Sequence, residues 1–156
     1  QQSHPPFHNT GAAFERPLIS SVFHNRLKKR MRLQTDPTII YGIMHETGRE
    51  IRNIRKSDIT RPTAYNTYVI KGLPPGPIGN PGIEAIRAAA KPKASDFLYF
   101  VSQNDGTHVF TENYKDHLKA VKKYQLNRKM REGKSWRDLK QKRVQWNTAF
   151  LFLSYP

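Results

Sequence analysis

Cysteine is absent from the 156-residue chain, which excludes a disulfide framework, a thiolate zinc site and a cysteine nucleophile. No run approaches the roughly 20 apolar residues of a membrane-spanning helix, and no signal-peptide pattern follows Gln1. A chain that opens in this way is predicted to be part of something longer. Acidic residues are few, 12 against 27 lysines and arginines, for a formal net charge of +15. This excess attracts polyanions such as nucleic acid, anionic lipid headgroups or acidic cell-wall polymer.

What is present predicts one folded domain with unstructured ends. The length and the 37% hydrophobic content suffice for a single core. Residues 1–9 are predicted to be a disordered or non-native lead-in. Residues 132–156 are predicted to be a basic, then apolar tail, with a non-native origin as one alternative. His4 and His8 have metal-ligand spacing only on a helix, which the two prolines between them oppose. We therefore predict no metal site, and no cofactor.

Helical periodicity and end signals predict four helices. They cover residues 14–27, 37–42, 81–90 and 113–131, with Asn80 capping the third. Gly42 is expected to end the second helix, and residues 43–64 to form a loop excursion with room for one short helix. The basic run at the end of the first helix (Arg26, Lys28, Lys29, Arg30 and Arg32) is expected to be solvated.

Two strands are predicted at residues 97–102 and 107–111, where aromatic and β-branched residues gather. The Asp105-Gly106 pair between them is typical of a type I′ hairpin turn. His108 should lie on the face opposite Val109. A half-exposed strand histidine is favoured over a functional one.

Residues 65–82 are the most informative stretch. Residues 65–70 are predicted to form a strand, and residues 72–82 a rigid loop, because four glycines and four prolines exclude a helix or a ladder. We expect the rings of Tyr65 and Tyr68 to share one face and to wall a groove for a polar, ring-shaped ligand. Asn66 would then point away and brace the loop at 72–78. A structural crossover without a ligand is an equal alternative.

Four segments in order resemble a known family. They are residues 21–27 (SVFHNRL), 33–42 (LQTDPTIIYG), 65–68 with 72–78 (YNTY and GLPPGPI), and 98–101 followed by 106–110 (LYFV and GTHVF). The chain resembles the C-terminal catalytic region of the MltG (YceG-like) endolytic murein transglycosylases, also catalogued as aminodeoxychorismate lyases. The resemblance covers residues 10–131 at most and is clearest up to Tyr124. With the predicted elements it indicates a small α+β domain with a β-hairpin, a Pro/Gly-rich loop and several packed helices.

The resemblance implies a peptidoglycan lyase of the bacterial inner membrane whose soluble part faces the periplasm. Such an enzyme cleaves MurNAc–GlcNAc bonds without water. A glutamic acid protonates the glycosidic oxygen, and its carboxylate then takes the proton of the C6 hydroxyl, which closes a 1,6-anhydro ring. The implied partners are peptidoglycan glycan strands and the cell-wall synthesis machinery.

The catalytic acid is where this chain departs from the family. The family glutamate opens a Glu-Lys-Glu-Thr run, which falls on residues 7–10 here, so Phe7 stands at the catalytic position. A phenyl ring neither donates nor accepts the proton. Glu15 is the nearest carboxyl, but a helix N-terminus favours its ionised form, so it is a poor substitute. We predict no catalytic residue in this chain, which suggests truncation, a frameshift or divergence.

The resemblance also implies five substrate-binding residues: Gln34, Asp36, Tyr65, Asn66 and Tyr68. Their amides would bind sugar hydroxyls, and their rings would pack on sugar faces. Two alternatives remain: a basic nucleic-acid-binding module and a non-catalytic glycan-binding fragment. The net charge and the basic C-terminal helix favour the nucleic-acid-binding module. However, the aromatic residues of the chain are not interleaved with basic residues, and the sequence has no nucleic-acid-binding signature. Nucleic acid is therefore not the expected partner.

Overall fold

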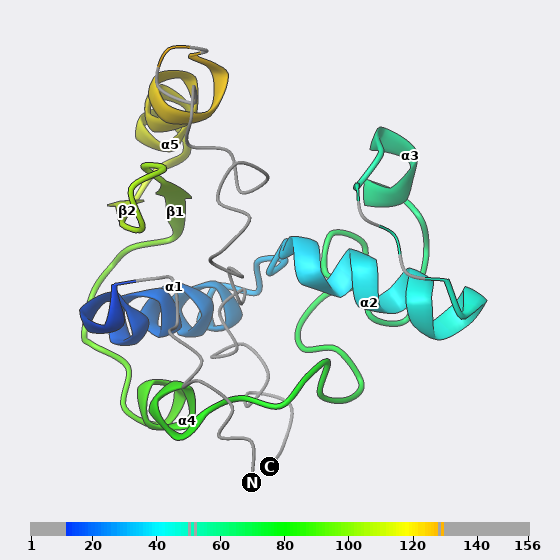
Figure 1. Ribbon diagram of the computed structural model, residues 1–156. Helices are drawn as coiled ribbons and strands as arrows, with labels where there is room; N and C mark the ends of the chain where they lie inside the picture. Colours follow the sequence, from blue (N-terminus) through cyan, green and yellow to red (C-terminus); the bar gives the residue numbers. More distant parts are fainter. Residues whose placement is uncertain (1–11, 50, 52, 128, 130–156) are drawn as a thin grey trace, which may run out of the picture.

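The structure is a computed structural model that describes residues 12–49, 51, 53–127 and 129. The predicted lead-in at 1–9, with Phe7, and the predicted tail at 132–156 lie outside these residues. Helices and one two-stranded antiparallel sheet make up the described part (Figure 1). The predicted α+β class is confirmed.

Helix α1 (Arg16–Lys28) is the centre of the fold, and a short 3-10 helix, η1 (Ala13–Glu15), leads into it. Ile19, Val22 and Phe23 are buried at the three- and four-residue steps of one helix face. Pro17 lies in the first turn, where its missing N–H leaves no helical bond unmade. The predicted helix at 14–27 is therefore confirmed.

Figure 1 shows α4 (Ile83–Ala90) on one side of α1 and the sheet on the other. Helix α4 turns three small buried alanines inward, which lets it approach α1 closely. Asn80 was expected to cap it, but Gly82 is the N-cap. Its extended backbone, φ −72° and ψ 161°, leaves residues 80 and 81 outside the helix.

The sheet pairs β1 (Tyr99–Ser102) with β2 (His108–Thr111) in antiparallel register, as predicted. The turn type differs from the prediction. Positive φ occurs at Asn104 (65°) and Gly106 (92°), and the Gln103 N–H donates to the Thr107 carbonyl at 2.9 Å. The turn is therefore longer than a two-residue type I′ loop.

The main apolar cluster joins α1, the sheet and two loops. Ile19, Phe23 and Leu33 are its buried members, and Leu27, Leu73, Phe100 and Phe110 pack against it. Phe23 meets Phe100 edge to face with ring centroids 5.9 Å apart, which is a favoured aromatic geometry. Leu73 brings the Pro/Gly-rich loop onto this core.

Helix α5 (Tyr114–Val121) follows the sheet and continues as a π-helical segment, η2 (Lys122–Leu126). The Asn113 side chain accepts a bond from the Asp116 N–H and so caps the start, as expected for asparagine. The predicted helix at 113–131 begins correctly but is interrupted at Asn127, and residues 128, 130 and 131 lie outside the described residues. Asn127 has an extended backbone, with ψ 111°, and ends the helical run.

Helix α2 (Asp36–Thr47) is twice as long as the predicted helix at 37–42. Gly48, with φ 67°, ends it, whereas Gly42 lies inside it. Gly42 serves a different purpose, since the buried Thr63 side chain packs directly on its Cα. The predicted excursion that follows contains one short helix, α3 (Lys56–Ile59), as allowed for.

The predicted strand at 65–70 is wrong, because that segment forms consecutive turns, with the Asn66 carbonyl accepting from the N–H groups of Val69 and Ile70. The Pro/Gly-rich segment at 72–82 is a loop, as predicted, and Figure 1 shows it running from beside α2 to α4. Among the residues described, no helix is both long enough and apolar enough to span a membrane.

Gly42→Ala tests the packing of Thr63 on α2. Alanine normally stabilises a helix interior by about 1 kcal/mol relative to glycine. Here its Cβ would collide with the Thr63 hydroxyl, so we expect a net loss of about 1–3 kcal/mol in the free energy of unfolding. Chemical denaturation measures it. In a Thr63→Ala background the same change should cost less, because the hydroxyl is gone although the Cβ of residue 63 still lies 3.0 Å from the added atom. A Gly42→Ala variant of the parent chain that is more stable than the parent would contradict the packing.

Gly106→Val tests the hairpin turn. A β-branched residue resists the φ of 92° at Gly106, so we expect a loss of about 1–3 kcal/mol. Gly106→Asn is the matched control with a smaller loss, since asparagine tolerates positive φ. Thermal melts of the three proteins compare them. Equal melting temperatures for the valine variant and the parent would refute the strained turn.

Candidate functional site

Three threonines fasten the 63–68 segment to the start of α2. The Thr67 N–H donates to the Thr38 hydroxyl at 3.1 Å, and the two hydroxyls lie 2.8 Å apart. The Thr35 N–H donates to the Thr67 hydroxyl at 3.0 Å. Thr38 and Thr67 are fully buried, so water does not compete for these bonds. Residues next to Thr67 are thereby held at fixed positions beside the first turn of α2.

The hydroxyl of Tyr68 donates to the Asp36 carboxylate at 2.7 Å, and this is the central contact of the candidate site. Burial raises the pKa of Tyr68, and the hydrogen bond and charge of Asp36 raise it further. The hydroxyl therefore stays protonated and remains a donor near neutral pH. Both residues are only partly buried.

Gln34 lies just before this contact, with an exposed side chain and a φ of 53°. Positive φ is uncommon for glutamine. The Gln34 N–H donates to the Thr67 carbonyl at 3.2 Å, which ties this backbone to the same segment. The structure therefore gathers Gln34, Asp36 and Tyr68, three of the five predicted substrate-binding residues, around the start of α2.

Asn66 is fully buried and acts as a brace. Its side-chain amide donates to the carbonyls of Ile59 at 3.0 Å and Arg61 at 2.8 Å, and its oxygen accepts the Tyr68 N–H at 3.0 Å. The expectation that it braces the loop at 72–78 is therefore wrong. It holds the turn after α3, because those carbonyls are the acceptors that surround it.

Tyr65 points to a different place from Tyr68. Its ring centroid lies 4.7 Å from that of Tyr41 and 5.3 Å from that of His45, both on α2. A Cβ added at Gly76 would lie 3.5 Å from the Tyr65 hydroxyl, so the ring tip reaches the Pro/Gly-rich loop. The shared face expected for the two tyrosines is wrong. Residues three apart would face opposite sides even on a strand.

Arg26 is a residue of this region that the sequence interpretation assigned to the solvated basic run. It is 8% exposed. Its guanidinium donates to the carbonyls of Leu98 at 2.6 Å and Leu33 at 3.0 Å and lies 5.0 Å from the Tyr99 ring centroid. Burial lowers the pKa of Arg26, while Tyr99 and Tyr68 raise it. Its spacing from Val22 and Phe23, at i+4 and i+3, was the signal that placed it on the buried face.

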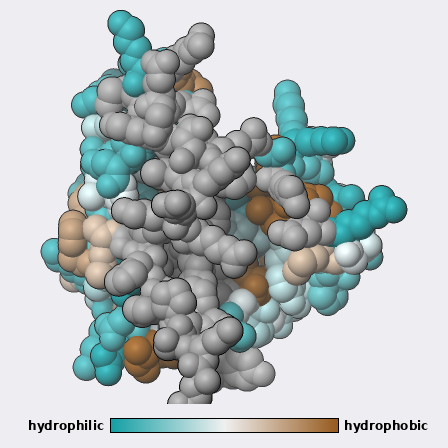
Figure 2. Space-filling view, in the orientation of Figure 1, coloured by the Kyte–Doolittle hydropathy of each residue, from teal (hydrophilic) through white to brown (hydrophobic). Residues whose placement is uncertain are grey.

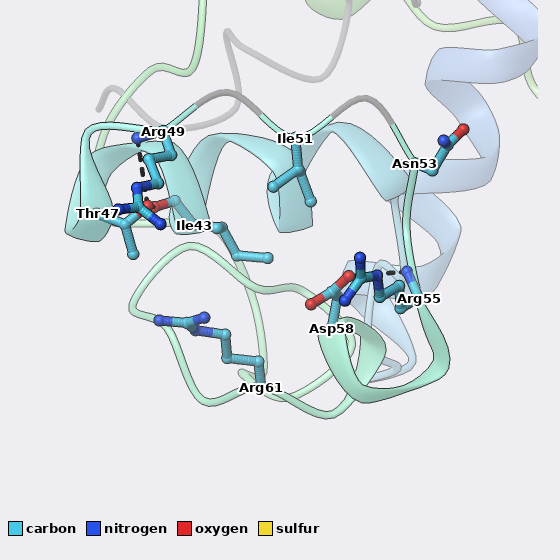
Figure 3. Close-up of a pocket in the computed structure, with 8 residues that line it drawn as sticks. All are labelled: Ile43, Thr47, Arg49, Ile51, Asn53, Arg55, Asp58 and Arg61. Carbon is cyan, nitrogen blue, oxygen red and sulfur yellow. Dashed lines mark hydrogen bonds between the residues drawn. The ribbon is translucent and has the colours of Figure 1, made fainter.

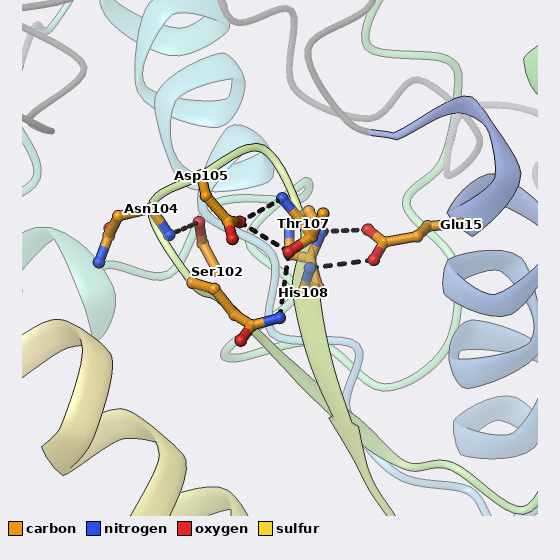
Figure 4. Close-up of polar contacts among 7 residues, drawn as sticks. Glu15, Ser102, Asn104, Asp105, Thr107 and His108 are labelled. Atoms are coloured by element: carbon orange, nitrogen blue, oxygen red, sulfur yellow. Dashed lines mark hydrogen bonds and ion pairs between the residues drawn. The ribbon is translucent and has the colours of Figure 1, made fainter.

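Glu15 forms a buried pair with His108, shown in Figure 4. The Glu15 residue is 4% exposed. One carboxylate oxygen accepts the His108 N–H at 3.1 Å, and the other lies 2.8 Å from ring Nδ1. This pair fastens the start of α1 to β2. The His108 side chain was predicted to be half-exposed. It is 19% exposed, and its ring bonds to Glu15.

No cluster of three or more His, Cys, Asp or Glu side chains that could hold a metal ion occurs among the described residues.

Known proteins with similar sequences identify the family that this chain resembles. The sequence model described as the YceG-like family matches residues 8–123. A protein of Bacillus subtilis (strain 168) named endolytic murein transglycosylase is 44% identical over 110 residues, which are 70% of this chain and 29% of that protein. A protein of the same name from Streptococcus pneumoniae serotype 2 (strain D39 / NCTC 7466) is 34% identical over 113 residues, 69% of this chain and 20% of that protein.

A solved structure agrees with the sequence comparisons. The crystal structure of a YceG-like protein from Listeria monocytogenes superposes with a TM-score of 0.62 at 42% identity, over 68% of this chain and 34% of that one. The chain spans under a third of the length of the two curated relatives. The match to the family model extends over most of the described residues, including α1, α2, the Pro/Gly-rich loop and the hairpin. This chain belongs to the YceG-like family.

Proposed function

We propose that this chain is the glycan-binding part of a peptidoglycan lytic transglycosylase, which cleaves MurNAc–GlcNAc bonds and leaves 1,6-anhydro ends. The contact between Tyr68 and Asp36 carries the proposal. It joins an aromatic ring to a carboxylate, and sugars present apolar ring faces beside hydroxyl donors. The printed names of the relatives support murein as the substrate.

Each predicted residue receives a role. The Tyr68 ring packs on a sugar face, the Asp36 carboxylate accepts from sugar hydroxyls, and the exposed Gln34 amide bonds to a neighbouring hydroxyl. The ring of Tyr65 and the rings of Tyr41 and His45 form a second aromatic surface, along which the glycan strand would continue. Asn66 is buried, so it positions Tyr68 without touching the glycan.

The net charge of +15 suits an acidic cell-wall polymer. Glycan strands would be the main partner, and the cell-wall synthesis machinery a further one. The chain would act at the cell envelope, facing the periplasm. Attachment to the inner membrane is proposed from the family resemblance alone. Residues 10–131 would be the family region, although the match to the family model begins at residue 8, and residues 132–156 would be a basic, then apolar tail.

We further propose that this chain binds without cleaving. The reaction needs a carboxylic acid that gives a proton to the glycosidic oxygen, and the family resemblance puts Phe7 at that position. Glu15 is a poor replacement because both of its oxygens are engaged by His108. A non-catalytic glycan-binding unit is therefore the form of the proposal that applies to this chain alone.

Tyr68→Ala tests the glycan surface. Removing a ring in direct contact should weaken binding of a peptidoglycan strand by about 1–3 kcal/mol. Calorimetric titration with purified strands measures this. Tyr68→Phe keeps the ring and removes only the bond to Asp36, so it separates the two contributions. Binding should weaken less with salt than the steep loss of affinity expected of a nucleic-acid-binding module.

Asn66→Ala is the contrasting variant. It leaves the carbonyls of Ile59 and Arg61 without their donor, so the free energy of unfolding should fall by roughly 1–3 kcal/mol. Binding by the folded fraction should persist. Loss of binding in a folded Asn66→Ala protein, with unchanged binding in Tyr68→Ala, would overturn the assignment of the surface.

Incubation with purified sacculi tests the absence of cleavage. We expect no 1,6-anhydromuropeptides above a blank by mass spectrometry. Phe7→Glu is the matched variant, and products from it alone would support Phe7 as the altered catalytic position. Products from the parent chain would contradict the proposal, and their loss in Glu15→Gln would identify Glu15 as the acid.

A further inference from the structure

A pocket of about 710 Å³ opens between α2 and α3, apart from the Tyr68–Asp36 contact. Figure 3 shows Ile43, from α2, and Ile51, from the loop after it, pointing into this space. Ile43 is 4% exposed and forms part of the floor. The remaining lining residues are polar or charged: Thr47, Arg49, Asn53, Arg55, Asp58 and Arg61. Figure 2 shows the same juxtaposition, with hydrophobic atoms beside hydrophilic ones over this region.

Positive charge dominates the rim of the pocket. Three arginines face one acid, Asp58, whose carboxylate already accepts the Arg55 backbone N–H at 2.8 Å. Arg61 lies 3.7 Å from Glu46, and both side chains are about two-fifths exposed (42% and 40%), so water screens this pair. In the sequence, the formal charges of Glu50 and Arg52 cancel.

The guanidinium groups of Arg49 and Arg55 are available to a ligand. Within the described part of the chain, neither guanidinium makes a hydrogen bond or an ion pair. The Arg49 backbone N–H donates to the Thr47 hydroxyl at 3.3 Å. A guanidinium presents a planar fork of donors that matches a carboxylate in two parallel bonds. The pocket therefore offers two such forks above an apolar floor.

We propose that this pocket binds the carboxylates of the peptide stem that murein carries on its muramic acid residues. The proposal rests on the proposed function, which supplies murein as the substrate. Stems combine carboxylates with alanine methyl groups. The carboxylates suit Arg49 and Arg55, and the methyl groups suit the floor formed by Ile43 and Ile51. The chain would then bind strands that carry stems more tightly than stripped glycan.

The length of α2 makes this assignment geometrically consistent. Asp36 and Thr47 are the first and last residues of the helix, so at 1.5 Å per residue they lie roughly 16 Å apart along its axis. A stem of four or five extended residues spans about 13–18 Å. A stem on a sugar held beside Asp36 therefore reaches the pocket at the other end of α2. One rigid helix would fix the spacing of the two subsites.

Titration of the full chain with a free stem tetrapeptide at low salt tests the pocket. The double variant Arg49→Gln/Arg55→Gln should weaken peptide binding about tenfold, because charge-assisted bonds are lost. Lys28→Gln/Lys29→Gln is the matched control. It removes the same charge from exposed side chains at the end of α1, and it should bind within about twofold of the parent. Circular dichroism verifies that all proteins remain folded.

Three further arms separate the causes of a failure. A peptide with amidated carboxylates should bind the parent more weakly. Tyr68→Ala should bind the free peptide like the parent, and peptide-free N-acetylglucosamine oligomers should bind both double variants like the parent. Failure of the oligomers to bind the parent would count against the proposed function and leave the peptide result readable.

Two results overturn the stem assignment. The first is a parent chain that does not bind the peptide, or a pocket variant that binds it as tightly as the parent. The second is preference for a glycerol-phosphate oligomer over the peptide, with that preference lost in the pocket variant, which would reassign the arginines to a phosphate polymer.

Discussion

The buried guanidinium of Arg26 is the interaction on which the arrangement of the domain depends. A charge without solvent must find hydrogen-bond acceptors or it destabilises the fold. Arg26 finds carbonyls in the loop after α1, at Arg32 and Leu33, and at Leu98 before β1, and its guanidinium lies over the ring of Tyr99. One side chain of α1 thereby holds both the entry to α2 and the entry to the sheet. The apolar cluster around Phe23 adds contact area to the same junction.

A second layer of constraint fixes the candidate site relative to that junction. The hydroxyl network of Thr38 and Thr67 holds the 63–68 segment on α2, and the amide of Asn66 holds it on the turn after α3. These buried polar groups are satisfied by backbone and hydroxyl partners, which makes the segment rigid without a strand. Tyr68 is then delivered to Asp36, whereas Tyr65 is delivered to Tyr41 and the Pro/Gly-rich loop.

The pairing of Glu15 with His108 gives this buried carboxylate a structural role. A buried acid with both oxygens hydrogen-bonded is a structural element that joins α1 to β2. The free guanidinium groups at the far end of α2 present the opposite case, with donors that the described residues leave unused. The proposed glycan and peptide subsites would lie at the two ends of α2.

The sequence alone determined the elements that local rules govern: α1 from its apolar face and Pro17, the hairpin from its aromatic runs and Asp105-Gly106, and the Pro/Gly-rich loop from its composition. Its motifs also indicated the family and named Gln34, Asp36 and Tyr68. The tertiary structure decided what depends on distant partners. The Thr63 side chain packs against Gly42, which lies inside α2, and the helix ends at Gly48 instead. Residues 65–70 form turns and not the predicted strand, because the Asn66 amide binds the Arg61 carbonyl and the Thr67 N–H binds the Thr38 hydroxyl. Helical spacing indicated that Arg26 lies on the buried face, but not what it would bind. Arg26 and Glu15 link distant segments, since Leu98 and His108 lie 72 and 93 positions along the chain, a separation that periodicity within a single helix does not encode.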